Sequence, residues 1–93
     1  MNLAFKDFGK VLGGRDTAEK IRVQIESSAS TVILDFADVR TVSHSFADEL
    51  IGKLAEKLGS SVFKEKISII NLSEDNRKIF SFVISERLSS KVA

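Results

Sequence analysis

The chain has no cysteine, no proline, no tryptophan and no tyrosine, and it has a single histidine. Without cysteine the protein can form no disulfide and no thiolate metal site, and one histidine alone does not make a usual zinc site. We therefore expect neither a metal nor another cofactor. Because the chain has 93 residues, no low-complexity tract and no internal repeat, residues 1–93 are expected to form one domain.

An excess of charge of one sign is also lacking. Lys and Arg number 14 and Asp and Glu number 13, so the net charge is +1, without the basic excess typical of nucleic-acid binding proteins. No apolar run is long enough for a signal peptide or a membrane span. Since 43% of the residues are apolar and 29% are charged, we expect a globular protein in the cytoplasm that binds neither nucleic acid nor a membrane.

Strand-like and helix-like stretches alternate along the chain. Strands are predicted over residues 31–36 and 66–72, and one or two short strands, with a hairpin as one option, over residues 3–12. Helices are predicted from Asp16 to about Ser27, from Ser45 to Leu58, and from Ser73 to Leu88. The stretch 31–36 is apolar on both faces, which indicates a central strand covered on both sides. This order predicts a small α/β domain with a mixed or mostly parallel sheet of about four strands and three helices.

The residues that start these helices follow from their types and spacing. Asp16 and Ser45 each precede an acid by three residues, which is the spacing of a capping box. Ser43 competes with Ser45 as the cap of the second helix. The apolar stripe of that helix leaves Asp48 and Glu49 on the side expected to face solvent.

The segment TVSHSFADEL, residues 41–50, places His44 between two serines and shortly before two acids. A hydrolase triad needs a nucleophile on a strained turn such as G-x-S-x-G and a histidine far away in sequence, because neighbouring side chains diverge. We therefore do not expect an enzyme. The alternative is a small nucleotide-binding or anion-binding domain, or a small enzyme, that uses Arg15, His44 and Asp48.

Two further features allow more than one interpretation. Arg15 follows two glycines and precedes a helix start, where an anion can bind, but an arginine in such a place more often pairs with a nearby acid. The last helix carries Phe80, Phe82, Val83 and Ile84, which cover more of its circumference than one buried stripe requires. A second copy of the chain in a homodimer, or a partner protein, would bury this extra apolar surface. Alternatively, the N-terminal strand or the C-terminal tail buries it.

Several motifs resemble those of a known family. They are Leu34-Asp35-Phe36, the segment S-H-S-F-A-D-E over residues 43–49, the segment G-R-D-T-A over residues 14–18, and the strand ending at residues 67–71. Together they resemble the STAS-like domains of unknown function, which are divergent relatives of the STAS domains of sulphate transporters and anti-sigma factor antagonists. The resemblance covers nearly the whole chain, and F-A-D-E is its most specific part.

The resemblance implies a STAS-like fold and a regulatory role in which a loop and a helix start bind a partner protein. The partner would be of the anti-sigma or histidine-kinase-like ATPase kind, in a bacterium. The implied contact residues are Ser43, His44, Ser45, Asp48 and Glu49. The serine that such proteins phosphorylate corresponds by position to His44, so the neighbouring Ser45 is the candidate phosphorylation site. Asp48 and Glu49 would repel a phosphate placed there.

Overall fold

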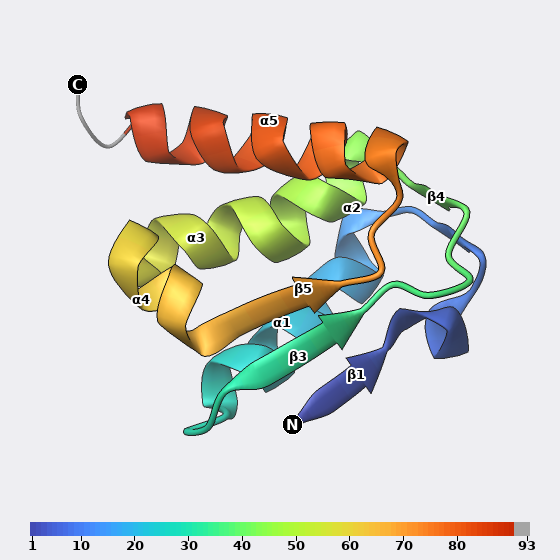
Figure 1. Ribbon diagram of the computed structural model, residues 1–93. Helices are drawn as coiled ribbons and strands as arrows, with labels where there is room; N and C mark the ends of the chain where they lie inside the picture. The colour runs from blue at the N-terminus through green and yellow to red at the C-terminus, as the bar shows by residue number, and fades with distance from the viewer. Residues whose placement is uncertain (91–93) are drawn as a thin grey trace.

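The computed structural model of the protein describes residues 1–90 (Figure 1). The strands are β1 (Asn2–Ala4), β2 (Val11–Leu12), β3 (Val32–Asp35), β4 (Thr41–Val42) and β5 (Ile67–Ile70). The helices are α1 (Arg15–Ser27), α2 (His44–Ala47), α3 (Lys53–Leu58), α4 (Ser60–Lys66) and α5 (Glu74–Ser90), with a 3-10 turn η1 (Phe5–Phe8) and a π-helical segment η2 (Asp48–Gly52). Since α2, η2 and α3 continue one another without a break, we call residues 44–58 the central helix.

The strands form two parallel sheets, so the predicted α/β class is confirmed. One sheet has the order β1-β3-β5, and the other pairs β2 with β4. The hairpin considered for residues 3–12 is wrong, because β1 and β2 each pair with a strand that follows α1. Parallel pairing requires such a crossover between the paired strands, and α1 supplies it. The short helix α4, just before β5, was not predicted.

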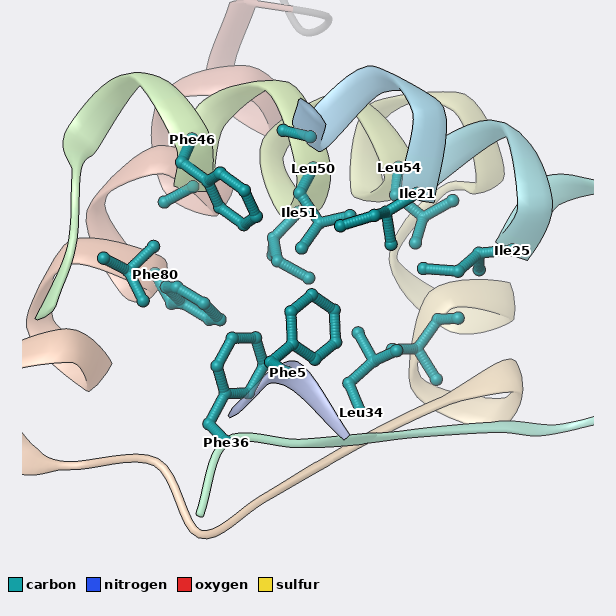
Figure 2. Close-up of a cluster of buried hydrophobic side chains, with 14 of the residues drawn as sticks. Phe5, Ile21, Ile25, Leu34, Phe36, Phe46, Leu50, Ile51, Leu54 and Phe80 are labelled. Carbon is teal, nitrogen blue, oxygen red and sulfur yellow. The ribbon is translucent and has the colours of Figure 1, made fainter. Parts of the chain in front are cut away.

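Helices cover one face of the three-stranded sheet. Val32 and Leu34 of β3 are buried beneath them, whereas Ile33 and Asp35 point to the opposite face and are less buried. In Figure 2 the helical side chains all approach β3 from one side. The expectation that β3 is covered on both sides is therefore wrong. On the open face Ile33 lies between Asn2 and Ser68, so polar neighbours flank its apolar side chain.

The core is built around three aromatic rings from distant parts of the chain. Phe5 stacks on Phe36 with ring centroids 4.3 Å apart, and Phe80 meets Phe36 edge-on at 5.2 Å. The helices contribute aliphatic side chains to the same buried cluster, and Figure 2 shows them on the side of the rings and of Leu34 that faces the helices: Ile21, Ile25, Leu50, Ile51 and Leu54. The aromatic rings thereby tie η1, the end of β3 and α5 into one core.

The first helix starts one residue earlier than predicted. Gly14 is the residue that precedes α1, with a φ of 85°, and Asp16 lies inside the first turn and makes no cap. A left-handed backbone at this position is easily adopted by glycine, and it turns the chain directly into the helix at Arg15. Asp16 still lies near the positive end of the helix dipole.

The central helix is capped by Ser43 and not by Ser45. The Ser43 hydroxyl accepts a hydrogen bond from the Phe46 N–H at 3.0 Å, and Ser45 lies within the first turn. The helix ends at Gly59, which has a φ of 84°. At the start of α5 the prediction is confirmed, because the Ser73 hydroxyl accepts from the Asn76 N–H at 3.2 Å.

Candidate functional site

The S-H-S-F-A-D-E segment divides into residues that face solvent and residues that face inward. His44 and Ser45 are exposed, and Ser43 is half-buried because it caps the helix. The side chains of Asp48 and Glu49 are only 13% and 3% exposed. The expectation that these two acids lie on the solvated side of the helix is therefore wrong.

Asp48 is held by two arginines from different helices. Arg87 of α5 donates two hydrogen bonds, from Nε to Oδ1 at 2.9 Å and from Nη2 to Oδ2 at 2.7 Å. Arg15 of α1 donates from Nη1 to Oδ2 at 3.0 Å. The hydrogen bonds from Arg87, and then the one from Arg15, lower the pKa of Asp48 to about 2 against the opposing effect of burial. A carboxylate bound in this way is a poor general base.

Glu49 is more deeply buried and is surrounded by three cations. Lys53 Nζ lies 2.9 Å from Oε1, Arg22 Nη2 lies 3.1 Å from Oε2, and Arg15 Nη1 lies 3.3 Å from Oε1. Arg22 Nε also donates to the Glu49 main-chain carbonyl at 2.9 Å. Burial by itself would raise the pKa of Glu49, but the hydrogen bonds from Lys53, Arg22 and Arg15 lower it below its ordinary value.

The two acids thus form the centre of a charged clamp that joins α1, the central helix and α5. The clamp consists of Arg15, Arg22, Asp48, Glu49, Lys53 and Arg87. Two further acids extend it, Glu26 through Arg22 and Glu56 through Arg87. This network holds the three helices against one another, and each of the two acids keeps at least one cationic partner when a single cation is truncated.

Gly52 allows Arg87 to cross the central helix. A Cβ on Gly52 would lie 2.8 Å from Asp48 Oδ1 and 3.1 Å from Arg87 Cγ. Gly52 also closes the π-helical segment, which begins at Asp48 itself. Neither Gly52 nor Arg87 was predicted as part of a site. The available signal was a glycine in the middle of a helical pattern, which often has a packing reason.

Of the three residues considered for an alternative nucleotide, anion or catalytic site, Arg15, His44 and Asp48, only two lie together. Arg15 and Asp48 form an ion pair. Pairing with a nearby acid was the alternative to anion binding at Arg15. The His44 ring instead lies against Phe82 of α5, with ring centroids 5.4 Å apart. The arginines occupy both carboxylate oxygens of Asp48, so this arrangement does not aim the carboxylate at His44.

An exposed surface lies at the start of the central helix. It consists of His44, Ser45 and Phe82, and we call it the His44–Phe82 surface. The Phe82 side chain is 53% exposed, although Phe80 and Val83 beside it in α5 are buried in the core. Two features that the sequence presented separately, the serine-histidine segment and the apolar excess of the last helix, are therefore one surface.

A parallel sheet with helices on one face, and a helix that starts with S-H-S-F-A-D-E, define a small STAS-like domain. The model of the STAS-like domain of unknown function (DUF4325) matches residues 17–77, and the chain belongs to this family. No curated protein and no solved structure gives a significant match to the chain. Within residues 1–90, no helix is both long and apolar enough to cross a membrane.

Proposed function

We propose that the protein is a regulatory protein-interaction module that binds a partner protein through the His44–Phe82 surface. The observation that carries the proposal is the half-exposed Phe82 ring held against His44, next to an exposed serine. Aromatic side chains, Phe included, are enriched in protein interfaces relative to the rest of the surface. The resemblance to anti-sigma factor antagonists favours a partner of the anti-sigma or histidine-kinase-like ATPase kind.

The clamp supports this proposal because it fixes the start of the helix that carries His44 and Ser45. Asp48 and Glu49 are neutralised by cations of α1, α5 and the central helix, so their role is to fix the position of the helix start. They contribute to partner binding by holding His44 and Ser45 in place. A direct contact with a partner would require one of these acids to give up an arginine or lysine.

Phosphorylation of Ser45 is the proposed means of regulation. Its hydroxyl is exposed and lies one helical turn before Asp48, so their Cβ atoms are about 5–6 Å apart. The repulsion expected from Asp48 is reduced, since Arg15 and Arg87 already balance its charge. A phosphate on Ser45 would therefore change the charge of the binding surface more than the stability of the fold.

The test is affinity capture from the native host with matched bait proteins. We expect wild-type protein and the Val62→Ser variant to retain the same partner, and the Phe82→Ser and Ser45→Asp variants to lose it. Val62 is a suitable control because it is 47% exposed and belongs to α4. Calorimetry with the purified partner should then show at least tenfold weaker binding for Phe82→Ser and Ser45→Asp, with unchanged melting curves.

The alternative occupant of this surface is a second copy of the chain. Sedimentation of the wild-type protein over a range of concentrations would show self-association, and loss of that association in Phe82→Ser would place the dimer contact at α5. A captured partner that binds all four proteins equally would contradict the proposal and place the interface on another face.

A further inference from the structure

A second candidate site lies beyond the carboxyl ends of β1 and β3. It is an open pocket of about 620 Å³ lined by Lys6, Asp7, Lys10, Asp38, Val39 and Arg40. Figure 1 shows that the segments carrying these residues, the turn that follows β1 and the segment leading to β4, lie past the arrowheads of the two strands. Parallel sheets commonly place ligands at this end of their strands. The pocket shares no residue with the His44–Phe82 surface or with the clamp.

The walls of the pocket are fixed by backbone hydrogen bonds and by the core. The Arg40 N–H donates to the Lys10 carbonyl at 2.8 Å, so these two residues lie side by side where β2 and β4 begin. Behind them Val39 is buried, and its N–H donates to the Phe36 carbonyl at 3.1 Å. Asp38 has a left-handed backbone with a φ of 65°, which closes the turn after β3. The backbone around the pocket is therefore fixed, while its charged side chains are exposed to solvent.

The cations of the pocket are poorly neutralised. Lys6 and Asp38 are 4.0 Å apart with side chains 55% and 74% exposed, a geometry that contributes little. In the described part of the chain, Lys10 and Arg40 make no ion pair. In contrast, Arg15 and Arg87 are each bound to an acid within 3.0 Å. Three basic and two acidic side chains line the pocket, so positive charge is left to attract an anion.

We propose that this pocket binds a phosphorylated polyhydroxy compound, either a sugar phosphate or a nucleotide. Lys6, Lys10 and Arg40 would hold the phosphate, since a guanidinium donates two parallel hydrogen bonds to phosphate oxygens. Asp7 and Asp38 would accept hydrogen bonds from the sugar hydroxyls. The volume lies within the range of small-molecule sites. Ligand binding here is a function separate from the partner surface, and it holds whether or not that surface binds a protein.

The test is a titration followed by amide chemical shifts of the whole chain, with ribose 5-phosphate, ADP and inorganic phosphate as probes. We expect saturable shifts in residues 6–10 and 38–40 and tighter binding of at least one organic phosphate than of inorganic phosphate. The relative affinities of ribose 5-phosphate and ADP distinguish a sugar-phosphate site from a nucleotide site. The double variant Lys10→Gln, Arg40→Gln should bind at least tenfold more weakly.

Two further variants make the test specific. Lys20→Gln, Lys64→Gln removes two exposed lysines outside the pocket and should leave the affinity unchanged. Asp38→Asn keeps a residue type that tolerates the left-handed backbone, and it should reduce the preference for the organic phosphate over inorganic phosphate. The proposal is overturned by an absence of saturable shifts, by shifts centred on Arg15 and His44, or by equal weakening in the control variant.

Discussion

At the scale of single residues, Asp48 connects the central helix to two other helices. Its two oxygens accept hydrogen bonds from Arg87 and Arg15, which belong to helices on either side of it. Bidentate arginine-carboxylate pairs are among the stronger polar contacts in proteins, provided that the side chains are held in place. The 13% exposure of Asp48 means that water screens these pairs only partly. Asp48 therefore fixes the distance between α1 and α5.

The lowered pKa of Asp48 predicts an acid-sensitive contribution to stability. The pKa falls from an ordinary 3.8 to about 2 on folding, so the native state binds fewer protons than the unfolded state in this range. The contribution is present above about pH 4 and is lost as the pH falls towards 2, and it amounts to about 2 kcal/mol. Urea melts of the wild type and of Asp48→Asn between these pH values should show a stability difference that shrinks with acidity. A constant difference would contradict the assignment.

The substitution Gly52→Ala should lower the stability of the protein, unlike most Gly→Ala substitutions in helices. In an exposed helix interior, Gly→Ala stabilises by about 1 kcal/mol because alanine has the higher helix propensity. At Gly52 the added Cβ would collide with Asp48 Oδ1 and approach the Arg87 side chain. We therefore expect Gly52→Ala to lower the free energy of unfolding by about 1–3 kcal/mol in urea melts. Ser81→Ala, on the exposed side of α5, is the control and should be nearly neutral. A more stable Gly52→Ala protein would show that Arg87 does not cross there.

At the scale of elements, the central helix connects the core, the clamp and the exposed surface. Ser43 caps its first turn, a π-helical segment occupies its middle, and Gly59 ends it. π-helical segments are uncommon and often occur at functional positions. Here the segment contains both acids of the clamp, and it lies against α1 and α5.

The two serines at the start of the central helix should differ in their effect on stability. Ser43→Ala removes the acceptor for the Phe46 N–H and should cost about 1 kcal/mol. Ser45→Ala should change the free energy of unfolding by less than about 0.5 kcal/mol, because it is an exposed position with no cap. Urea melts of both variants at neutral pH provide the measurement. The reverse ranking would mean that Ser45 is the cap after all.

Helices and strands with a clear apolar period could be predicted from the sequence, but the contacts between distant parts of the chain could not. The apolar residues of α1, the central helix and α5 recur at helical spacing, and β3 and β5 are short apolar runs, so the sequence predicts all five elements. Helix α4 was missed because only Val62 and Phe63 mark it in a short, otherwise polar stretch. The apolar stripe of the central helix predicts that Asp48 and Glu49 face solvent, because both lie off the stripe. Their burial depends on Arg87 and other cations that are distant in sequence.

At the scale of the whole molecule, residues outside the family segment contribute to both the core and the clamp. The match covers residues 17–77, whereas Phe5, Phe80 and Arg87 lie outside it. Two of these supply rings of the central aromatic cluster, and the third holds Asp48. Residues 17–77 alone would leave one face of Phe36 uncovered, and Asp48 would lose both of its arginines, since Arg15 also lies outside the match.

We therefore predict that a fragment of residues 17–77 does not fold by itself, while residues 1–90 do. The fragment also lacks Val83 and the strands β1 and β2, so it loses buried apolar surface from several sides of the core. Circular dichroism with urea should show a cooperative transition for the longer chain only, and amide spectra of the fragment should be poorly dispersed. A cooperative transition in the fragment would restrict the folding unit to the family segment.

The pairing of the strands also determines when the sheet can form. Asn2 pairs with Ile33, Val11 with Thr41, and Val32 with Ile67, so no two consecutive strands within residues 1–90 are partners. Each pairing must close a long loop before it contributes stability, which places folding nearer milliseconds than microseconds. During synthesis β3 has no second neighbour until β5 has left the ribosome. From the emergence of β3 until the emergence of β5, the nascent chain therefore exposes an unpaired strand edge, and during this interval aggregation or chaperone binding competes with folding.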